Sequence, residues 1–135
     1  MGKYGETAVR AVALLRSGNR TAEDAWREAA SEIFPDAPEA RAKVCPRETF
    51  LGLCQDGLLE GISSERCARS EASKNRLYAA AAMRVIANDP EIAAGSKTEL
   101  WRRVMREAGA EPDKKHNQQL DVVLTLRSHG YIASG

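Results

Sequence analysis

The stretches Thr21–Trp26 (TAEDAW) and Ser96–Trp101 (SKTELW) decide the fold that this sequence predicts. Each opens on a hydroxyl side chain that can cap the free N–H groups of a helix start, and each reaches a tryptophan five residues later. An acidic residue stands three residues after each hydroxyl, as in a capping box. Because the two stretches lie 75 residues apart, the sequence predicts one helical unit that occurs twice.

Apolar residues at helical spacing predict two further helices in each half of the chain. These helices are expected at about 6–17 and 46–57 in the first half, and at about 71–87 and 117–130 in the second. The endings Gly57–Leu59 and Gly130–Ile132 share a Gly-apolar-apolar pattern and lie 73 residues apart. We therefore expect an all-α fold, with two tandem three-helix repeats of helix-turn-helix-like form packed as one compact domain.

The predicted domain boundaries follow from this repeat. The first repeat covers 1–62, a linker covers 63–73, and the second repeat covers 74–135; the linker sequence SSERCARSEAS is polar and rich in small residues. Each half holds too few apolar residues for a core of its own, so we expect the halves to pack together. Trp26 and Trp101 are expected to be buried anchors at equivalent positions.

The composition excludes several classes of protein. The 135 residues include 20 basic and 19 acidic side chains, so the net charge is only +1. That balance excludes a strongly basic nucleic-acid binder and an acidic tail as descriptions of the whole chain. No apolar run approaches the ~20 residues of a membrane span, and the opening ten residues lack the apolar core of a signal peptide. A cytoplasmic, non-membrane protein is expected.

The cysteines and histidines predict neither a disulfide framework nor a metal site. Cys45, Cys54 and Cys67 are odd in number and widely spaced, so we expect reduced thiols. His116 and His129 add no close pair of the kind that structural zinc sites use. No glycine-rich phosphate loop is visible either, and we expect no cofactor.

Two stretches resemble a family of short, uncharacterised bacterial proteins that is a domain of unknown function. They are CPRETFLGLCQDGLLEGI (Cys45–Ile62) and KHNQQLDVVLTLRSHGYI (Lys115–Ile132). The opening KYGETAVRAVALL is similar to the same family, so the likeness covers most of the chain. The resemblance implies an all-helical protein of bacterial origin, and no activity, substrate or cofactor.

The most promising site lies where the third helix of each half begins. Arg47 stands beside the expected helix start at Pro46, and Lys115 and His116 precede Asn117, which we expect to cap the corresponding helix. Helix N-termini with adjacent cations bind carboxylate or phosphate. We therefore favour a non-enzymatic binding or regulatory module for a protein partner or an anionic ligand, with the two helix starts beside one shared groove.

Two other functions remain open. The last helix carries a polar set that suits base reading in a helix-turn-helix-like DNA-binding protein, and Arg102, Arg103 and Arg106 could follow phosphates. The polar set comprises Gln118, Gln119, Asp121, Thr125 and Arg127. The second alternative is an enzyme in which Cys45, at a helix N-cap, acts as a nucleophile activated by His116. No third orienting group is recognisable, so neither residue is assigned a catalytic role.

Overall fold

The computed structural model describes residues 2–67, 73–111 and 114–132, and these residues form an all-helical fold. In the first half, the order is α1 (Lys3–Ser17), α2 (Ala22–Ile33), α3 (Pro38–Arg41) and α4 (Val44–Gln55). The second half contains α5 (Lys74–Asn88), α6 (Lys97–Ala108) and α7 (Gln119–Ser128). Two short 3₁₀ helices, η1 (Ser64–Cys67) and η2 (Pro90–Ala94), precede α5 and α6.

The capping signals that predicted the fold act as expected. The Thr21 hydroxyl accepts a hydrogen bond from the Asp24 N–H at 3.2 Å and starts α2. The Ser96 hydroxyl accepts one from the Glu99 N–H at 3.3 Å and starts α6. Each satisfies a backbone donor that would otherwise lack a partner in the helix. Gly109 ends α6 in the left-handed conformation, with φ of 72°, which glycine adopts without steric cost.

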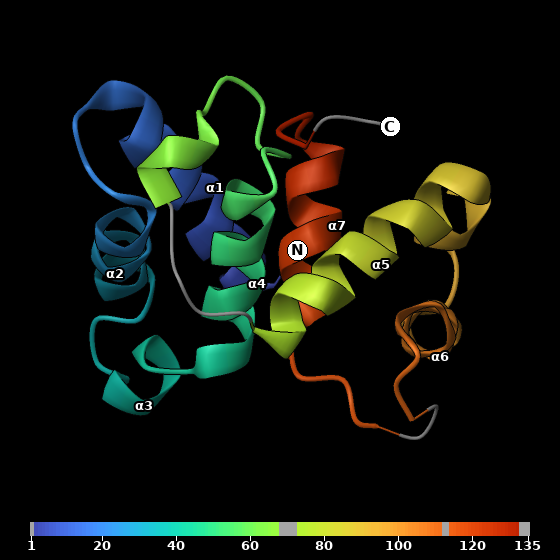
Figure 1. Ribbon diagram of the computed structural model, residues 1–135. Helices are drawn as coiled ribbons and strands as arrows, with labels where there is room; N and C mark the ends of the chain where they lie inside the picture. The colour runs from blue at the N-terminus through green and yellow to red at the C-terminus, as the bar shows by residue number, and fades with distance from the viewer. Residues whose placement is uncertain (1, 68–72, 112–113, 133–135) are drawn as a thin grey trace.

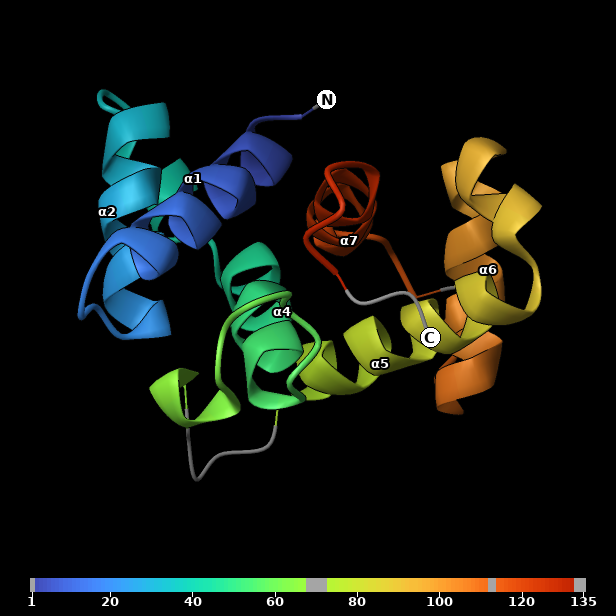
Figure 2. The same ribbon diagram turned by 90° about the horizontal axis from the view of Figure 1, so that it is seen from above.

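The helices pack in two pairs with two further helices between them. Helix α1 packs on α2, and α5 packs on α6. Helices α4 and α7 contact each other between the two pairs (Figures 1 and 2). Helix α4 packs mainly on α5, and α7 packs mainly on α1. The last helix of each half, α4 or α7, therefore contacts the first helix of the other half, α5 or α1. One core joins the described helices of both halves.

Both tryptophans are buried, as the sequence predicted. Trp26 is 2% exposed and its ring lies 5.3 Å from that of Phe50, measured between centroids. Trp101 is 5% exposed and its ring lies 5.7 Å from that of Tyr78. Each indole joins the second helix of its half to another element of the core.

Two close helix crossings depend on glycine. At Gly52 in α4, a Cβ atom would lie 2.7 Å from the Cα of Arg76 in α5. At Gly5 in α1, a Cβ atom would collide with the Thr125 hydroxyl of α7. Real Cβ atoms do not approach other heavy atoms so closely, so these positions exclude larger residues.

The two halves also meet where α4 and α7 end. Gly57 and Gly130 have φ of 72° and 73°, and each turns the chain out of its helix. Leu59 and Ile132 then pair as an antiparallel bridge, and the Glu60 N–H donates to the Tyr131 carbonyl at 2.9 Å. The two Gly-apolar-apolar endings are thus in direct contact.

The expectation of fully reduced cysteines is wrong. Cys54, at the end of α4, forms a disulfide with Cys67 in η1. The sequence spacing gave no sign of it, because the contact depends on how η1 folds back onto α4. Cys45 is free and half-buried.

Part of the expected linker is anchored to the first half. The Arg66 guanidinium donates to the carbonyls of Leu15, Gly18 and Arg20, at 2.6, 2.6 and 2.8 Å. It thereby satisfies acceptors at the end of α1 and in the loop that leads to α2. The rest of the predicted linker, at 68–72, lies outside the described residues.

No helix in the described part of the chain is long and apolar enough to cross a membrane.

Candidate functional site

The segment that leads into α7 borders a hollow of about 460 Å³ at the start of α6. We call it the lysine hollow, and its lining residues are Lys97, Thr98, Trp101, Arg102, Lys114, Lys115 and His116. None of these residues is acidic. Arg102 pairs with Glu99 on the helix surface, but no ion pair in the described part of the chain involves the three lysines. The hollow is therefore electropositive.

Trp101 fixes the wall of this hollow. Its indole N–H donates to the Lys114 carbonyl at 2.7 Å, which ties the segment before α7 to α6. Its ring also meets that of His116 edge-on, with 5.1 Å between centroids. The backbone carrying Lys114, Lys115 and His116 is consequently held in place before any ligand arrives, which lowers the entropic cost of binding.

His116, rather than Asn117, caps α7. The His116 Nε2 atom accepts a hydrogen bond from the Leu120 N–H at 3.0 Å. Gln118 stands at the N-cap position with φ of 70°, in the left-handed region, and its side chain makes no capping bond. That turn places the imidazole over the helix start, while the Asn117 N–H donates to the Gln119 side-chain oxygen at 2.7 Å. The prediction that Asn117 is the cap is wrong for this reason.

The environment of His116 favours the neutral imidazole. Its pKa is lowered from the ordinary 6.5, chiefly by burial and then by the positive charge of Lys97. Lys43, which precedes α4, lowers this pKa further, whereas Asp121 opposes the shift. An acceptor at Nε2 requires an unprotonated nitrogen, so the proton of the neutral ring is on Nδ1.

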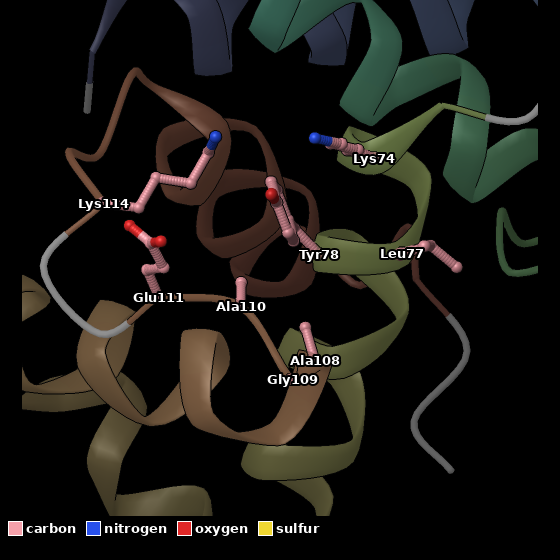
Figure 3. A pocket seen from close by; sticks show the side chains of 8 residues that line it. All are labelled: Lys74, Leu77, Tyr78, Ala108, Gly109, Ala110, Glu111 and Lys114. Carbon is pink, nitrogen blue, oxygen red and sulfur yellow. The ribbon is translucent and has the colours of Figure 1, made fainter.

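A second hollow, of about 560 Å³, adjoins the lysine hollow at Lys114. It is formed by α5 and by the residues that follow α6, with Lys114 lining both hollows. Figure 3 shows the amines of Lys74 and Lys114 extending toward one another above the Tyr78 ring. The Lys114 Nζ lies 5.8 Å from the centroid of that ring, and Glu111 supplies the acidic group of this hollow. The cationic character thus continues beyond the lysine hollow.

Arg47 lies elsewhere. It lines a hollow of about 250 Å³ between α2, α3 and α4, which we call the arginine hollow; its lining residues are Glu23, Trp26, Arg27, Arg41 and Arg47. The structure therefore places the two parts of the predicted shared groove in two different hollows. The two helix starts remain within electrostatic range, since Lys43 acts on His116.

Cys45 is not a helix cap. Helix α4 begins at Val44 with Lys43 at the N-cap position, so Cys45 lies within the first turn. Its carbonyl accepts a hydrogen bond from the Thr49 hydroxyl at 2.8 Å. Proline at the next position fits this first turn, because it has no N–H to leave unpaired. His116, the base predicted for Cys45, instead accepts the Leu120 N–H at its Nε2 atom.

Three residues of the polar set on the last helix are buried. Gln119, Asp121 and Thr125 are 3%, 4% and 6% exposed. The Asp121 carboxylate accepts the N–H groups of Gly2 and Gly5 at 3.2 and 2.9 Å, and thus caps α1. These three side chains serve helix packing, whereas Gln118 and Arg127 are exposed. Central helices bury polar residues when another element supplies the partners, which a single sequence does not reveal.

Sequence reasoning missed Lys97 as a partner of Lys115 and His116, and it considered Arg102 only for the DNA-binding alternative. One signal was available: Lys97 is the first residue of α6, where a cation opposes the positive end of the helix dipole. A lysine at that position suggests a role other than helix stability. The described residues contain no group of three or more histidine, cysteine or acidic side chains placed to hold a metal ion.

Comparisons with known proteins agree with the resemblance seen in the sequence. Searches of curated proteins and of solved structures give no significant match. A family model described as a family of unknown function, DUF6979, matches residues 1–133. The chain therefore belongs to this family of unknown function.

Proposed function

We propose that the chain is a non-enzymatic binding module that holds an anionic ligand in the lysine hollow. The observation that carries this proposal is the charge of that hollow: three lysines, Arg102 and His116 line it with no acidic residue among them. The amines of the lysines that line the hollow are not neutralised by ion pairs within the described residues, whereas most arginines of the chain are. An anion would supply the missing negative charge.

The ligand is a small molecule or a small anionic group. A volume of about 460 Å³ lies within the range typical of small-ligand sites. Lys97 and Thr98 form the first turn of α6, so the positive end of that helix adds to the lysine charges. Phosphate and carboxylate groups both suit this set of donors.

The other functions have less support. Base reading by the last helix would rely on the exposed Gln118 and Arg127 alone, because Gln119, Asp121 and Thr125 are buried. A Cys45–His116 enzyme would need a free imidazole, and the Nε2 atom of His116 accepts the Leu120 N–H. We therefore retain the anionic-ligand hypothesis from among the sequence-based alternatives.

We also infer that the fold is two three-helix repeats related by an approximate twofold axis. The contact of Gly52 with Arg76 and the contact of Thr125 with Gly5 join corresponding positions of α4 with α5 and of α7 with α1. An antiparallel bridge between Leu59 and Ile132, 73 residues apart, is the pairing that such an axis would produce. In this arrangement the last helix of each repeat, α4 or α7, packs on the first helix of the other repeat.

Titration calorimetry with pyrophosphate tests the binding proposal. Lys115→Ala combined with Lys97→Ala is expected to weaken binding at least tenfold, because each amine contributes a charge-assisted contact. The unfolding free energy should change by less than about 0.5 kcal/mol, since both lysines are exposed. Arg106→Ala, an exposed residue of α6 that does not line the hollow, controls for net charge and should bind like the wild type.

Wild-type protein that binds neither pyrophosphate nor citrate at low salt would overturn the proposal. Equal weakening by the Arg106 variant would also contradict it, because the effect would then reflect overall charge rather than the hollow. A competing titration with duplex DNA distinguishes the helix-turn-helix alternative, which predicts binding that falls steeply with salt.

A further inference from the structure

We propose a second oxyanion site, in the arginine hollow, with Arg27, Arg41 and Arg47 as the cationic residues that surround the ligand. The three arginines line this hollow of about 250 Å³ and also an adjoining one of about 270 Å³. They come from α2, from α3 and from the first turn of α4. Glu23 is the one acidic residue among the side chains that line either hollow.

The position of this hollow corresponds to that of the lysine hollow. Glu23, Trp26 and Arg27 line one, and the residues found 75 positions later, Thr98, Trp101 and Arg102, line the other. In both, the opposite wall comes from residues around the start of the third helix of that half. Each half of the chain thus sets a buried tryptophan and an exposed arginine of its second helix beside cations from that region.

Two of the three arginines of this hollow keep N–H donors for a ligand, whereas Arg27 is paired with Asp24 at 2.8 Å. Arg41 donates one NH₂ group to the carbonyls of Phe34 and Pro35, at 3.3 and 3.1 Å, which fixes its guanidinium without consuming its charge. Arg47 forms an ion pair with Glu48 at 3.6 Å, which is longer than a good hydrogen bond. A guanidinium carries five N–H donors, so both groups retain donors for a ligand.

The chemistry of the donors defines the ligand group. Planar guanidinium forks bind phosphate and carboxylate in a bidentate manner, whereas lysine amines act as point charges. The small volume suits one oxyanion group rather than a large molecule. This inference rests on the proposed function only for the ligand class, because the two hollows share no residue.

Two-dimensional proton–nitrogen NMR tests the second site, because each hollow has its own tryptophan. The indole N–H signals of Trp26 and Trp101 are followed during titration with pyrophosphate and, separately, with citrate, and Trp26→Phe assigns them. We expect the Trp26 signal to shift with saturation. Arg47→Ala should weaken that response about tenfold and leave the Trp101 response unchanged. Saturation by pyrophosphate or by citrate identifies the preferred group.

Conservative and control variants make the result specific. Arg47→Lys keeps the charge but loses the fork, so it should bind nearly as weakly as Arg47→Ala. Arg20→Ala, whose arginine pairs with Glu28 away from the hollow, should bind like the wild type. Signal dispersion in the remaining spectrum shows that each variant is folded.

Three results would overturn the inference. A Trp101 signal that shifts while the Trp26 signal stays fixed would remove the second site and leave the proposed function intact. Two signals that both stay fixed would remove both proposals. A full response in Arg47→Lys would contradict recognition by the guanidinium fork.

Discussion

The His116 imidazole couples the stability of α7 to pH. It accepts the Leu120 N–H only in its neutral form, and burial together with Lys97 lowers its pKa below the ordinary 6.5. Between the lowered value and 6.5, the unfolded chain binds more protons than the folded chain. The contribution of His116 to the unfolding free energy is therefore complete above pH 6.5 and is lost as the pH falls through the folded pKa.

His116→Ala should remove this pH dependence. We expect it to cost about 1 kcal/mol at pH 7.5, a typical value for a helix cap, and less at pH 5. Urea denaturation at several pH values measures both quantities. His129→Ala, which removes an exposed histidine that caps no helix start, is the matched control. A variant at position 116 that keeps the wild-type slope would show that another group causes it.

Asp121 illustrates a residue whose role depends on the tertiary fold. Its carboxylate accepts two backbone N–H groups at the start of α1, and the Gly5 bond is buried. Asp121→Ala would leave those donors unpaired, so we expect a loss of about 3 kcal/mol in unfolding free energy. Asp121→Asn retains one acceptor oxygen and should lose less. Denaturation of the two variants measures the difference, and an alanine variant within 0.5 kcal/mol of wild type would contradict this role.

The sequence predicted the helix caps at Thr21 and Ser96 because a cap is a local interaction between residues three apart. It did not predict the cap at His116, since the left-handed Gln118 shifts the geometry by one residue. Nor did it predict that Asp121 caps a helix more than a hundred residues away. Such contacts depend on packing rather than on local pattern.

At the scale of elements, the crossing of α4 and α5 depends on Gly52. Gly52→Ala would place a Cβ atom 2.7 Å from the Arg76 Cα, and backbone cannot move aside as a flexible side chain can. Although alanine favours helix, we expect the collision to dominate and to lower the unfolding free energy by about 2 kcal/mol. Gly95→Ala is the control, because the nearest atom to its Cβ would be 3.7 Å away. Equal stability of the two variants would refute the close crossing.

The Cys54–Cys67 disulfide ties η1 to the end of α4 across a sequence separation of 13 residues. Closing a loop of this size stabilises a folded chain by about 3 kcal/mol in the chain-entropy model. Dithiothreitol should therefore lower the denaturation midpoint of wild type and of Cys45→Ser. It should leave the double variant Cys54→Ser/Cys67→Ser unchanged. Wild-type protein that is insensitive to reduction would contradict the disulfide's stabilising role.

At the scale of the whole molecule, the sequence predicted the helices but not how they pack on one another. Helical spacing and caps were sufficient for an all-helical chain with buried tryptophans. They carry no information about which helices meet, so the packing of α4 on α5 and of α7 on α1 was not foreseen. Lys115 and His116 were identified from their position before a helix, but the hollow also needs Lys97 from α6.

Together, the proposed site and the fold predict how an anion in the lysine hollow would change the pKa of His116. Burial and then Lys97 lower the pKa of His116, so the positive potential that would attract an anion also disfavours the imidazolium. An anion held among Lys97, Lys115 and His116 would offset that potential. Binding should therefore raise the pKa of His116, and by linkage the ligand should bind more tightly as that histidine becomes protonated.

An NMR titration of the two histidine rings between pH 4.5 and 8, with and without saturating pyrophosphate, measures this directly. We expect His116 to titrate below 6.5 in the free protein and at a clearly higher pH with pyrophosphate. His129, which does not line the hollow, should be unaffected. A His116 pKa that does not change when pyrophosphate is added, or that changes no more than that of His129, would contradict an anion site in the lysine hollow.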